Sequence, residues 1–173
     1  SGSIAKILSN EEQKNLIKHL ELNENDIVFL SGSEKLSKVC LSLGALRKEI
    51  AKNHIEIDKN RFDLLWIVDF PLFEYDKDQK KYFSSHHPFT MPLEEDIEFF
   101  NSDPSKIRAH HYDLVMNGYE LGSGSLRISD PKIQRDVFKT LNFTEKEIEE
   151  NFGFFINAFE YGTPPHGGVA FGL

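Results

Sequence analysis

Residues 109–128 constrain the fold more than any other part of the sequence. Polar and apolar residues alternate along this stretch, and the pair Asn117-Gly118 stands near its middle. Alternation with a period of two is typical of strands, and Asn-Gly is a preferred pair for tight hairpin turns. The stretch therefore predicts two antiparallel strands within a mostly antiparallel sheet.

Further strands are expected on both sides of this hairpin. Residues 64–71 form an apolar run that ends in proline, which predicts a buried strand. The polar residues 76–79 separate two short β-prone runs, 73–76 and 80–85, as in a second hairpin. The last ten residues, 164–173, predict a loop that enters a strand.

Helices are expected between and after these strands. The acidic stretch 93–107 predicts helical or irregular structure. Asp130 and Thr144 are typical N-caps, and they predict helices over 131–141 and 145–161. The strands and helices together indicate an α+β fold.

The N-terminal part of the chain has a different spacing of apolar residues. A helix is expected over residues 10–20, with Asn10 or Ser9 as its cap. The short apolar run 27–30 suits a strand, and the apolar spacing within 33–52 predicts a second helix. These elements would make a small α/β unit.

The apolar spacing changes near Phe62, which predicts two domains, residues 1–62 and 63–173. Charge is also unevenly divided, because residues 1–64 hold ten basic and ten acidic side chains, so the whole net charge of −8 belongs to residues 65–173. An acidic chain is unsuited to a sequence-independent grip on DNA or RNA, which needs clustered Lys and Arg. Carboxylates can still bind phosphate groups through a magnesium ion that both coordinate.

Other classes of protein are excluded by simple counts. The one cysteine, Cys40, leaves no disulfide framework and no cysteine-based zinc cage. No run approaches the roughly 20 apolar residues that cross a bilayer, and the N-terminus lacks the layout of a signal peptide. A cytoplasmic protein is expected, with no membrane partner.

The densest cluster of chemically capable residues lies in 112–127. Asp113 and Glu120 could hold a hard divalent cation if neighbouring strands bring them together, although two solvated carboxylates on an exposed sheet face are the plainer alternative. Arg127 could bind a carboxylate with both arms of its guanidinium, and its plainer alternative is a surface ion pair.

Small residues separate these charged groups. Gly122-Ser123-Gly124-Ser125 permits close backbone approach, which suits a loop that wraps a small ligand, although a tight turn would also explain it.

Two imidazoles, His86 and His87, follow the second predicted hairpin. Adjacent residues of a strand point to opposite faces, so only one of the two is expected to meet a given ligand. A packed histidine and a ligand contact that changes protonation remain the two alternatives.

The sequence strings at these positions resemble bacterial-type aspartyl-tRNA synthetases, a group of class II aminoacyl-tRNA synthetases. The strings occur in family order and at about family spacing: WIVDFPLF (66–73), HHPFT (86–90), NGYELGSGSLRI (117–128) and YGTPPHGGVAFGL (161–173). One departure is Gly122-Ser123-Gly124-Ser125, where the family usually has Gly-Gly-Gly-Ser.

The resemblance implies a two-part fold. Residues 63–173 would be part of a class II catalytic domain that stops at the start of the third class motif. Residues 1–62 would be the latter part of the insertion domain of bacterial members, in which Gly44-Ala45-Leu46-Arg47 is the most recognisable run. The apolar end at Phe171-Gly172-Leu173 indicates a cut.

The resemblance also implies roles for single residues in the binding of L-aspartate and ATP. Arg127 would bind the side-chain carboxylate of aspartate, His86 would close the pocket, and Ser125 would shape its floor. Glu120, helped by Asp113, would hold ATP through Mg2+. Gly172 and Leu173 would lie against the nucleotide.

The implied reaction is the activation of aspartate by ATP to aspartyl-adenylate, followed by transfer to tRNA, without an organic cofactor or a covalent protein nucleophile. The first two class motifs and the anticodon-binding domain are missing, so the fragment alone is expected to be inactive. The parent would be a homodimer, whereas the fragment could exist as a monomer.

Two other functions stay open at this point. Residues 1–62 could act as a tRNA- or partner-binding module, although residues 1–64 are charge-neutral and lack aromatic platforms for unpaired bases. A metal-dependent hydrolase built on His86, His87, Asp113 and Glu120 would need tight metal binding without a nucleotide.

Overall fold

The computed structural model describes residues 6–56 and 58–172, and the chain divides into two units between Lys59 and Asn60. The first unit contains the helices α1 (Asn10–His19) and α2 (Leu36–His54), as expected from the sequence.

Ser9, and not Asn10, caps α1. The backbone N–H of Glu12 donates to Oγ of Ser9 at 3.3 Å, and the N–H of Ser9 donates to the Glu12 carboxylate at 2.8 Å. This reciprocal pair satisfies N–H groups that the first turn of a helix leaves without a partner.

The expected strand over residues 27–30 is wrong, because this segment has no regular structure. A strand needs a neighbour for its backbone groups, and no strand forms among the described residues of the first unit. Ile27 stays 77% exposed and Phe29 52% exposed. The unit is therefore two helices without a strand or a buried residue among its described positions, and not α/β.

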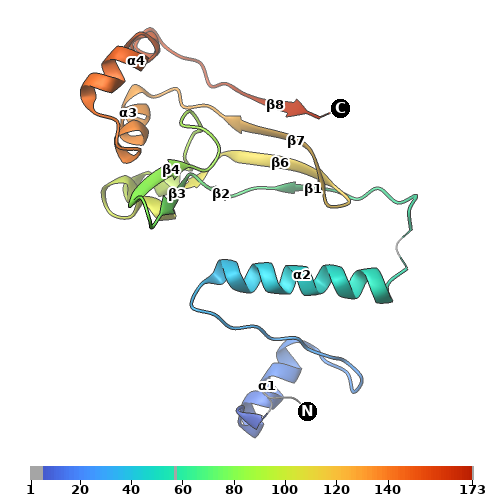
Figure 1. Cartoon of the computed structure of the whole chain (residues 1–173). Helices are drawn as coiled ribbons and strands as arrows, with labels where there is room; N and C mark the ends of the chain where they lie inside the picture. The colour runs from blue at the N-terminus through green and yellow to red at the C-terminus, as the bar shows by residue number, and fades with distance from the viewer. Residues whose placement is uncertain (1–5, 57, 173) are drawn as a thin grey trace. The chain divides into compact units, whose positions relative to one another are not determined.

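The second unit is built on a four-stranded antiparallel sheet in the order β1-β6-β7-β8 (Figure 1). The strands are β1 (Leu64–Ile67), β6 (His111–Met116), β7 (Tyr119–Leu126) and β8 (Gly167–Phe171). Asn117 and Gly118 have φ angles of 51° and 86° and connect β6 to β7. The predicted hairpin is confirmed.

Two small strand pairs and two 3-10 helices extend this unit. β2 (Phe70–Pro71) pairs with β5 (Arg108–Ala109), and β3 (Phe73–Asp76) forms the second predicted hairpin with β4 (Lys81–Ser84). The acidic stretch forms η2 (Glu94–Asn101) and η3 (Pro104–Lys106).

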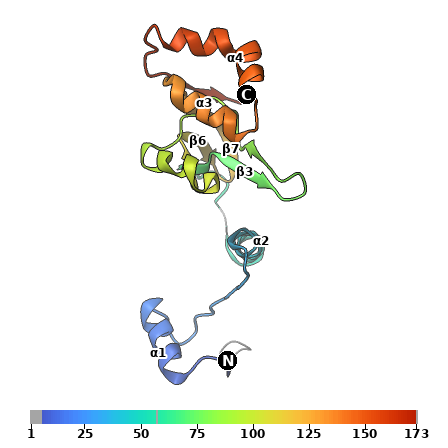
Figure 2. The same cartoon turned by 90° about the vertical axis from the view of Figure 1, so that its left-hand side faces the viewer.

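Two helices, α3 (Pro131–Thr140) and α4 (Glu145–Phe159), pack against each other beyond the end of β7 (Figure 2). The Asp130 side chain accepts from two N–H groups of the first turn of α3, and Thr144 forms a capping box with Glu147 at the start of α4. Both predicted caps are confirmed.

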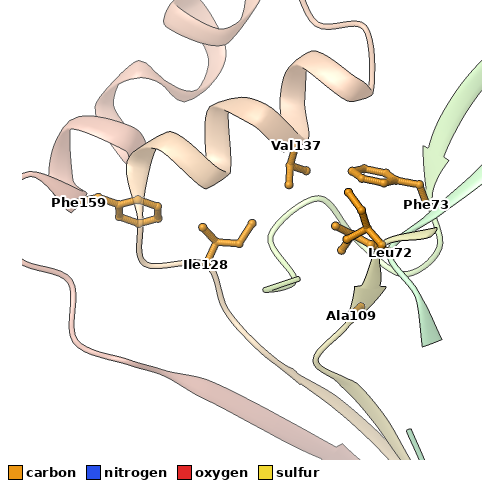
Figure 3. Close-up of a cluster of buried hydrophobic side chains, with 7 residues drawn as sticks. Leu72, Phe73, Ala109, Ile128, Val137 and Phe159 are labelled. Carbon is orange, nitrogen blue, oxygen red and sulfur yellow. The ribbon is translucent and has the colours of Figure 1, made fainter. Parts of the chain in front are cut away.

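The hydrophobic core lies against these helices and not on the four-stranded sheet. Its first cluster joins residues at the start of β3, residues in and before β5, Ile128 after β7, and both helices (Figure 3). The second cluster consists of Phe138, Ile148 and Ile156, with further phenylalanines around it. The first cluster contains Leu72, Phe73, Ile107, Ala109, Ile128, Val137 and Phe159.

The expectation that residues 64–71 form a buried strand is only half right. β1 forms, but its side chains are exposed, including Trp66 at 54%. β1 is an edge strand, and neither of its faces is covered by the rest of the second unit. Within the described part of the chain, no helix combines the length and the apolar character that a membrane span requires.

Candidate functional site

The register of β6 and β7 places the polar residues of the hairpin on one face. His111 lies opposite Ser125, and Asp113 lies opposite Ser123. Because residues two apart on a strand share a face, these four side chains lie together.

A register shift near the hairpin turn brings Glu120 to the same face. Leu114 pairs with Gly122, but the next residue, Val115, pairs with Glu120. Leu121 is therefore an extra residue on β7, and the bulge reverses the alternation. Without this bulge, Glu120 and Ser123 would point to opposite sides of the sheet.

A pocket of about 570 Å³ opens over this face. It brings together His86, Glu120 and Arg127, three of the residues that the sequence singled out. Its lining consists of two histidines, one acid, one arginine and small or apolar residues of β7, of β8 and just after β8: His86, His87, Glu120, Leu121, Gly122, Ser123, Gly124, Arg127, Gly168, Val169, Ala170 and Gly172.

Arg127 has its charge free for a ligand. No carboxylate among the described residues lies within 4.0 Å of its guanidinium, whereas Arg108 pairs with both Asp96 and Glu95. The surface ion pair considered from sequence is therefore not found in the described part of the chain. Arg127 is held through its backbone, which bridges to Thr90 and donates to the His166 carbonyl at 2.9 Å.

His87 contacts the Arg127 side chain. Nη1 of Arg127 lies 3.0 Å from Nδ1 of His87, and Nε2 of His87 lies 3.4 Å from Oγ of Ser125. Burial, followed by the nearby charge of Arg127, lowers the pKa of His87 to about 4. The imidazole is therefore neutral at physiological pH.

Both histidines of the pair reach the same pocket, so the expectation that they point to opposite faces is wrong. The rings of His86 and His87 lie 4.4 Å apart, and His86 stacks on His111 at 4.3 Å. β4 ends at Ser84, and the chain turns after it, so strand alternation does not apply. Burial, followed by the nearby His111 and Arg127, lowers the pKa of His86.

Asp113 lies beneath the pocket and is not part of its lining. One of its carboxylate oxygens is 3.1 Å from Nε2 of His111, yet this buried oxygen has no hydrogen bond among the described residues. His111 also contacts Ser123 at 3.0 Å and stacks on Phe70 at 4.2 Å. No group of three or more His, Cys, Asp or Glu residues within 6–56 and 58–172 is arranged to hold a metal ion.

The glycine-rich segment is a strand and not the expected loop. Gly122 and Gly124 belong to β7, and the need for glycine comes from the neighbouring strand β8. A Cβ atom on Gly122 would lie 2.8 Å from the Ala170 carbonyl oxygen, and one on Gly124 would overlap that of Gly168.

Of the three remaining residues expected in the site, one is buried, one lines the pocket and one is outside the described residues. Ser125 is fully buried below the pocket. Gly172 lines the pocket, and its N–H donates to the Leu121 carbonyl at 2.8 Å. Leu173 lies outside the described residues. The sequence indicated no role for His111 and pointed to His87 only as a packed or ligand-contacting histidine and in the hydrolase alternative, because the contacts of both depend on tertiary structure.

A larger and more open hollow of about 840 Å³ occurs in the first unit. Its walls include Leu8, Leu16 and Leu30 with Lys18 and His19. Its charged and titratable groups, Glu12, Lys18 and His19, are exposed residues of α1.

Comparison with known proteins identifies the family. Residues 3–173 match the model described as tRNA synthetases class II (D, K and N), so the chain belongs to this family. It is 52% identical over 172 residues to an Aspartate--tRNA(Asp/Asn) ligase of Anoxybacillus flavithermus and 49% identical to one of a Geobacillus strain. The resemblance to bacterial-type aspartyl-tRNA synthetases is confirmed.

The alignments with these relatives cover 99% of this chain and 29% of theirs, so the chain spans 29% of their length. Among solved structures, the aspartyl-tRNA synthetase of Entamoeba histolytica aligns with a TM-score of 0.44 at 20% identity, covering 92% of this chain and 26% of that one. An asparaginyl-tRNA synthetase of the same organism aligns with a TM-score of 0.42 at 14% identity, covering 95% and 29%.

Proposed function

We propose that this chain is part of an aspartate–tRNA ligase, which activates L-aspartate with ATP to aspartyl-adenylate and transfers the aspartyl group to tRNA. The observation that carries the proposal is Arg127, whose guanidinium faces a pocket without a carboxylate partner among the described residues. Relatives about half identical over the whole chain are named as ligases of this specificity.

The aspartate side chain is the natural partner of Arg127. The two oxygens of a carboxylate match the guanidinium fork, whereas the NH2 group of asparagine would place donors against donors, at a cost of about 2 kcal/mol or more. His86 lines the same pocket and would close over the amino acid. Ser125 shapes the floor from below through its contact with His87.

Glu120 is the residue that we assign to ATP. Its carboxylate lines the pocket and has no ion pair among the described residues, and Asp113 keeps a buried oxygen without a hydrogen bond on the same strand face. Oxygen donors of this kind suit Mg2+ shared with phosphate oxygens. A bound magnesium ion would neutralise phosphate charge, while Gly172, followed by Leu173, would lie against the nucleotide.

Catalysis in such a site depends on positioning and charge stabilisation, because no protein side chain needs to form a covalent bond to a substrate. The α-carboxylate of aspartate attacks the α-phosphate of ATP, and pyrophosphate leaves. Arg127 holds the far end of aspartate, which fixes the direction of the attacking carboxylate.

The remaining assignments concern the parent protein. We place residues 1–62 in the insertion domain and residues 63–173 in the catalytic domain of a cytoplasmic homodimer that binds tRNA. Because the chain covers 29% of its relatives, we expect it to be inactive by itself.

The test is aspartate-dependent ATP–pyrophosphate exchange by the full-length protein, with Arg127→Ala and the matched variant Arg135→Ala. Arg135 lies on α3, outside the lining of the pocket, and forms an ion pair with the exposed Glu145 at 3.7 Å. Exchange should require aspartate, should fail in Arg127→Ala and should persist in Arg135→Ala. Exchange that survives Arg127→Ala would remove Arg127 from the site, and exchange driven by another amino acid would overturn the function.

A further inference from the structure

The contacts of His87 support an inference that goes beyond the proposed function. This inference rests on that function. Arg127 can only donate hydrogen bonds, so the 3.0 Å contact requires Nδ1 of His87 to accept. The proton of the neutral ring must then lie on Nε2, the nitrogen that faces Oγ of Ser125 at 3.4 Å.

The chemical nature of this partner matters for the charge of the pocket. A carboxylate at the position of His87 would hold the guanidinium more strongly, but it would neutralise the charge that a substrate carboxylate needs. A neutral imidazole fixes the direction of Arg127 and leaves its positive charge intact. One N–H of Nη1 is used in this contact, which leaves the other donors of the fork for a ligand.

The backbone around His87 is itself fixed from two sides. The buried Gln134 of α3 donates from Nε2 to the Pro88 carbonyl at 2.8 Å. The N–H of Ile128 donates to the Phe89 carbonyl at 3.0 Å, next to the bridge between Thr90 and Arg127. The turn that carries His87 is thus tied directly to the segment that carries Arg127.

The His87 ring is also held locally. The backbone N–H of Phe89 points at Nδ1 from 3.3 Å, and the Thr90 hydroxyl lies 3.2 Å away. The Phe89 N–H and the Thr90 hydroxyl share the one lone pair of Nδ1 with Arg127, and together these contacts fix the ring before any ligand binds, which lowers the entropy cost of binding.

We propose that His87 is a positioning and specificity-determining residue, which holds the Arg127 fork toward the side-chain carboxylate of the amino acid substrate through the 3.0 Å contact from Nη1 to Nδ1. His87 would act through Arg127 and not through a contact of its own with the substrate. It sets how well aspartate is bound and how strongly asparagine is rejected.

Replacement of His87 by asparagine or by glutamine tests the roles of its two ring nitrogens separately. The amide of asparagine takes the place of Nδ1 and can accept from Arg127, whereas the longer glutamine places its amide near Nε2 and loses this contact. The full-length protein should be measured as wild type, His87→Asn and His87→Gln by ATP–pyrophosphate exchange, with kcat and the KM values for aspartate and ATP determined separately. His110→Gln is the matched control, because His110 contacts Glu94 at 3.0 Å, away from the pocket.

We expect His87→Gln to raise the KM for aspartate about tenfold, the size expected for one hydrogen bond to a charged group. The KM for ATP and kcat should change much less, and His87→Asn should stay within about twofold of wild type for aspartate. Equal losses in the two variants, unchanged KM for aspartate in His87→Gln, or parallel losses in both substrates would each overturn the proposal. A wild type without aspartate-dependent exchange would instead overturn the function, and the role of His87 with it.

Discussion

The guanidinium of Arg127 and the imidazole of His87 are joined by a 3.0 Å contact across 40 residues of sequence. Arg127 follows the long strand β7, and His87 lies in the turn after β4. The pairing fixes a positive charge in the pocket, and within 6–56 and 58–172 no carboxylate forms an ion pair with it. The same pairing makes the stability of the folded chain depend on pH.

Stability should depend on pH through His87. Its pKa is about 4 in the folded chain, mainly because of burial and then because of Arg127, whereas an unfolded histidine has a pKa of about 6.5. Between these values the unfolded state binds more protons, so the free energy of unfolding should fall as pH is lowered through this window. Urea denaturation of the wild-type chain and of His87→Asn tests this, because the variant should lose part of the decrease. An identical pH dependence in the two proteins would contradict the assignment of a neutral His87.

Removal of the Glu120 charge should weaken the use of magnesium. In the full-length protein, Glu120→Gln should raise the Mg2+ concentration for half-maximal exchange by roughly tenfold or more, because a hard cation prefers a charged oxygen ligand to an amide. The KM for aspartate should change less. The control is Glu98→Gln, since Glu98 is an exposed acid on η2. An unchanged magnesium requirement in Glu120→Gln would exclude Glu120 from metal binding.

Close contact between β7 and β8 should make Gly124 intolerant of a side chain. A Cβ atom there would overlap the Gly168 carbonyl oxygen and lie 2.6 Å from a ring carbon of Tyr112. Relief requires movement of a paired strand, so Gly124→Ala should lower the free energy of unfolding by about 1–3 kcal/mol.

The matched variant for this experiment is Gly168→Ala. A Cβ atom on Gly168 meets no atom within 4 Å, and its backbone φ is not in the left-handed region. Gly168→Ala should therefore leave stability nearly unchanged in the same urea titration. A comparable loss in both variants would show that the contacts with Gly168 and Tyr112 do not set the cost at Gly124, because alanine is no worse than glycine inside a strand.

Local chemistry made some elements of the fold predictable. Asp130 and Thr144 cap α3 and α4 because their side-chain oxygens accept from N–H groups two or three residues away. Asn117 and Gly118 form the β6–β7 turn because both tolerate positive φ angles. None of these features needs a distant part of the chain.

The predictions that failed depended on distant neighbours. The strand expected over residues 27–30 has no strand to pair with among the described residues of its unit. The apolar pattern of β1 suggested burial, but whether a strand face is covered depends on what packs against it. The glycines of β7 were read as a ligand loop, whereas their real neighbour is β8.

The sequence by itself determined the family, the hairpin, the helix caps and four residues of the pocket, His86, Glu120, Arg127 and Gly172, because these are recorded in residue types and short spacings. Tertiary structure alone decided how they meet. The bulge at Leu121 turned Glu120 toward the pocket, and the turn after β4 brought His87 to Arg127. The physical reason is that side-chain direction and hydrogen-bond pairing depend on strand register and on backbone turns, and contacts between distant residues fix both.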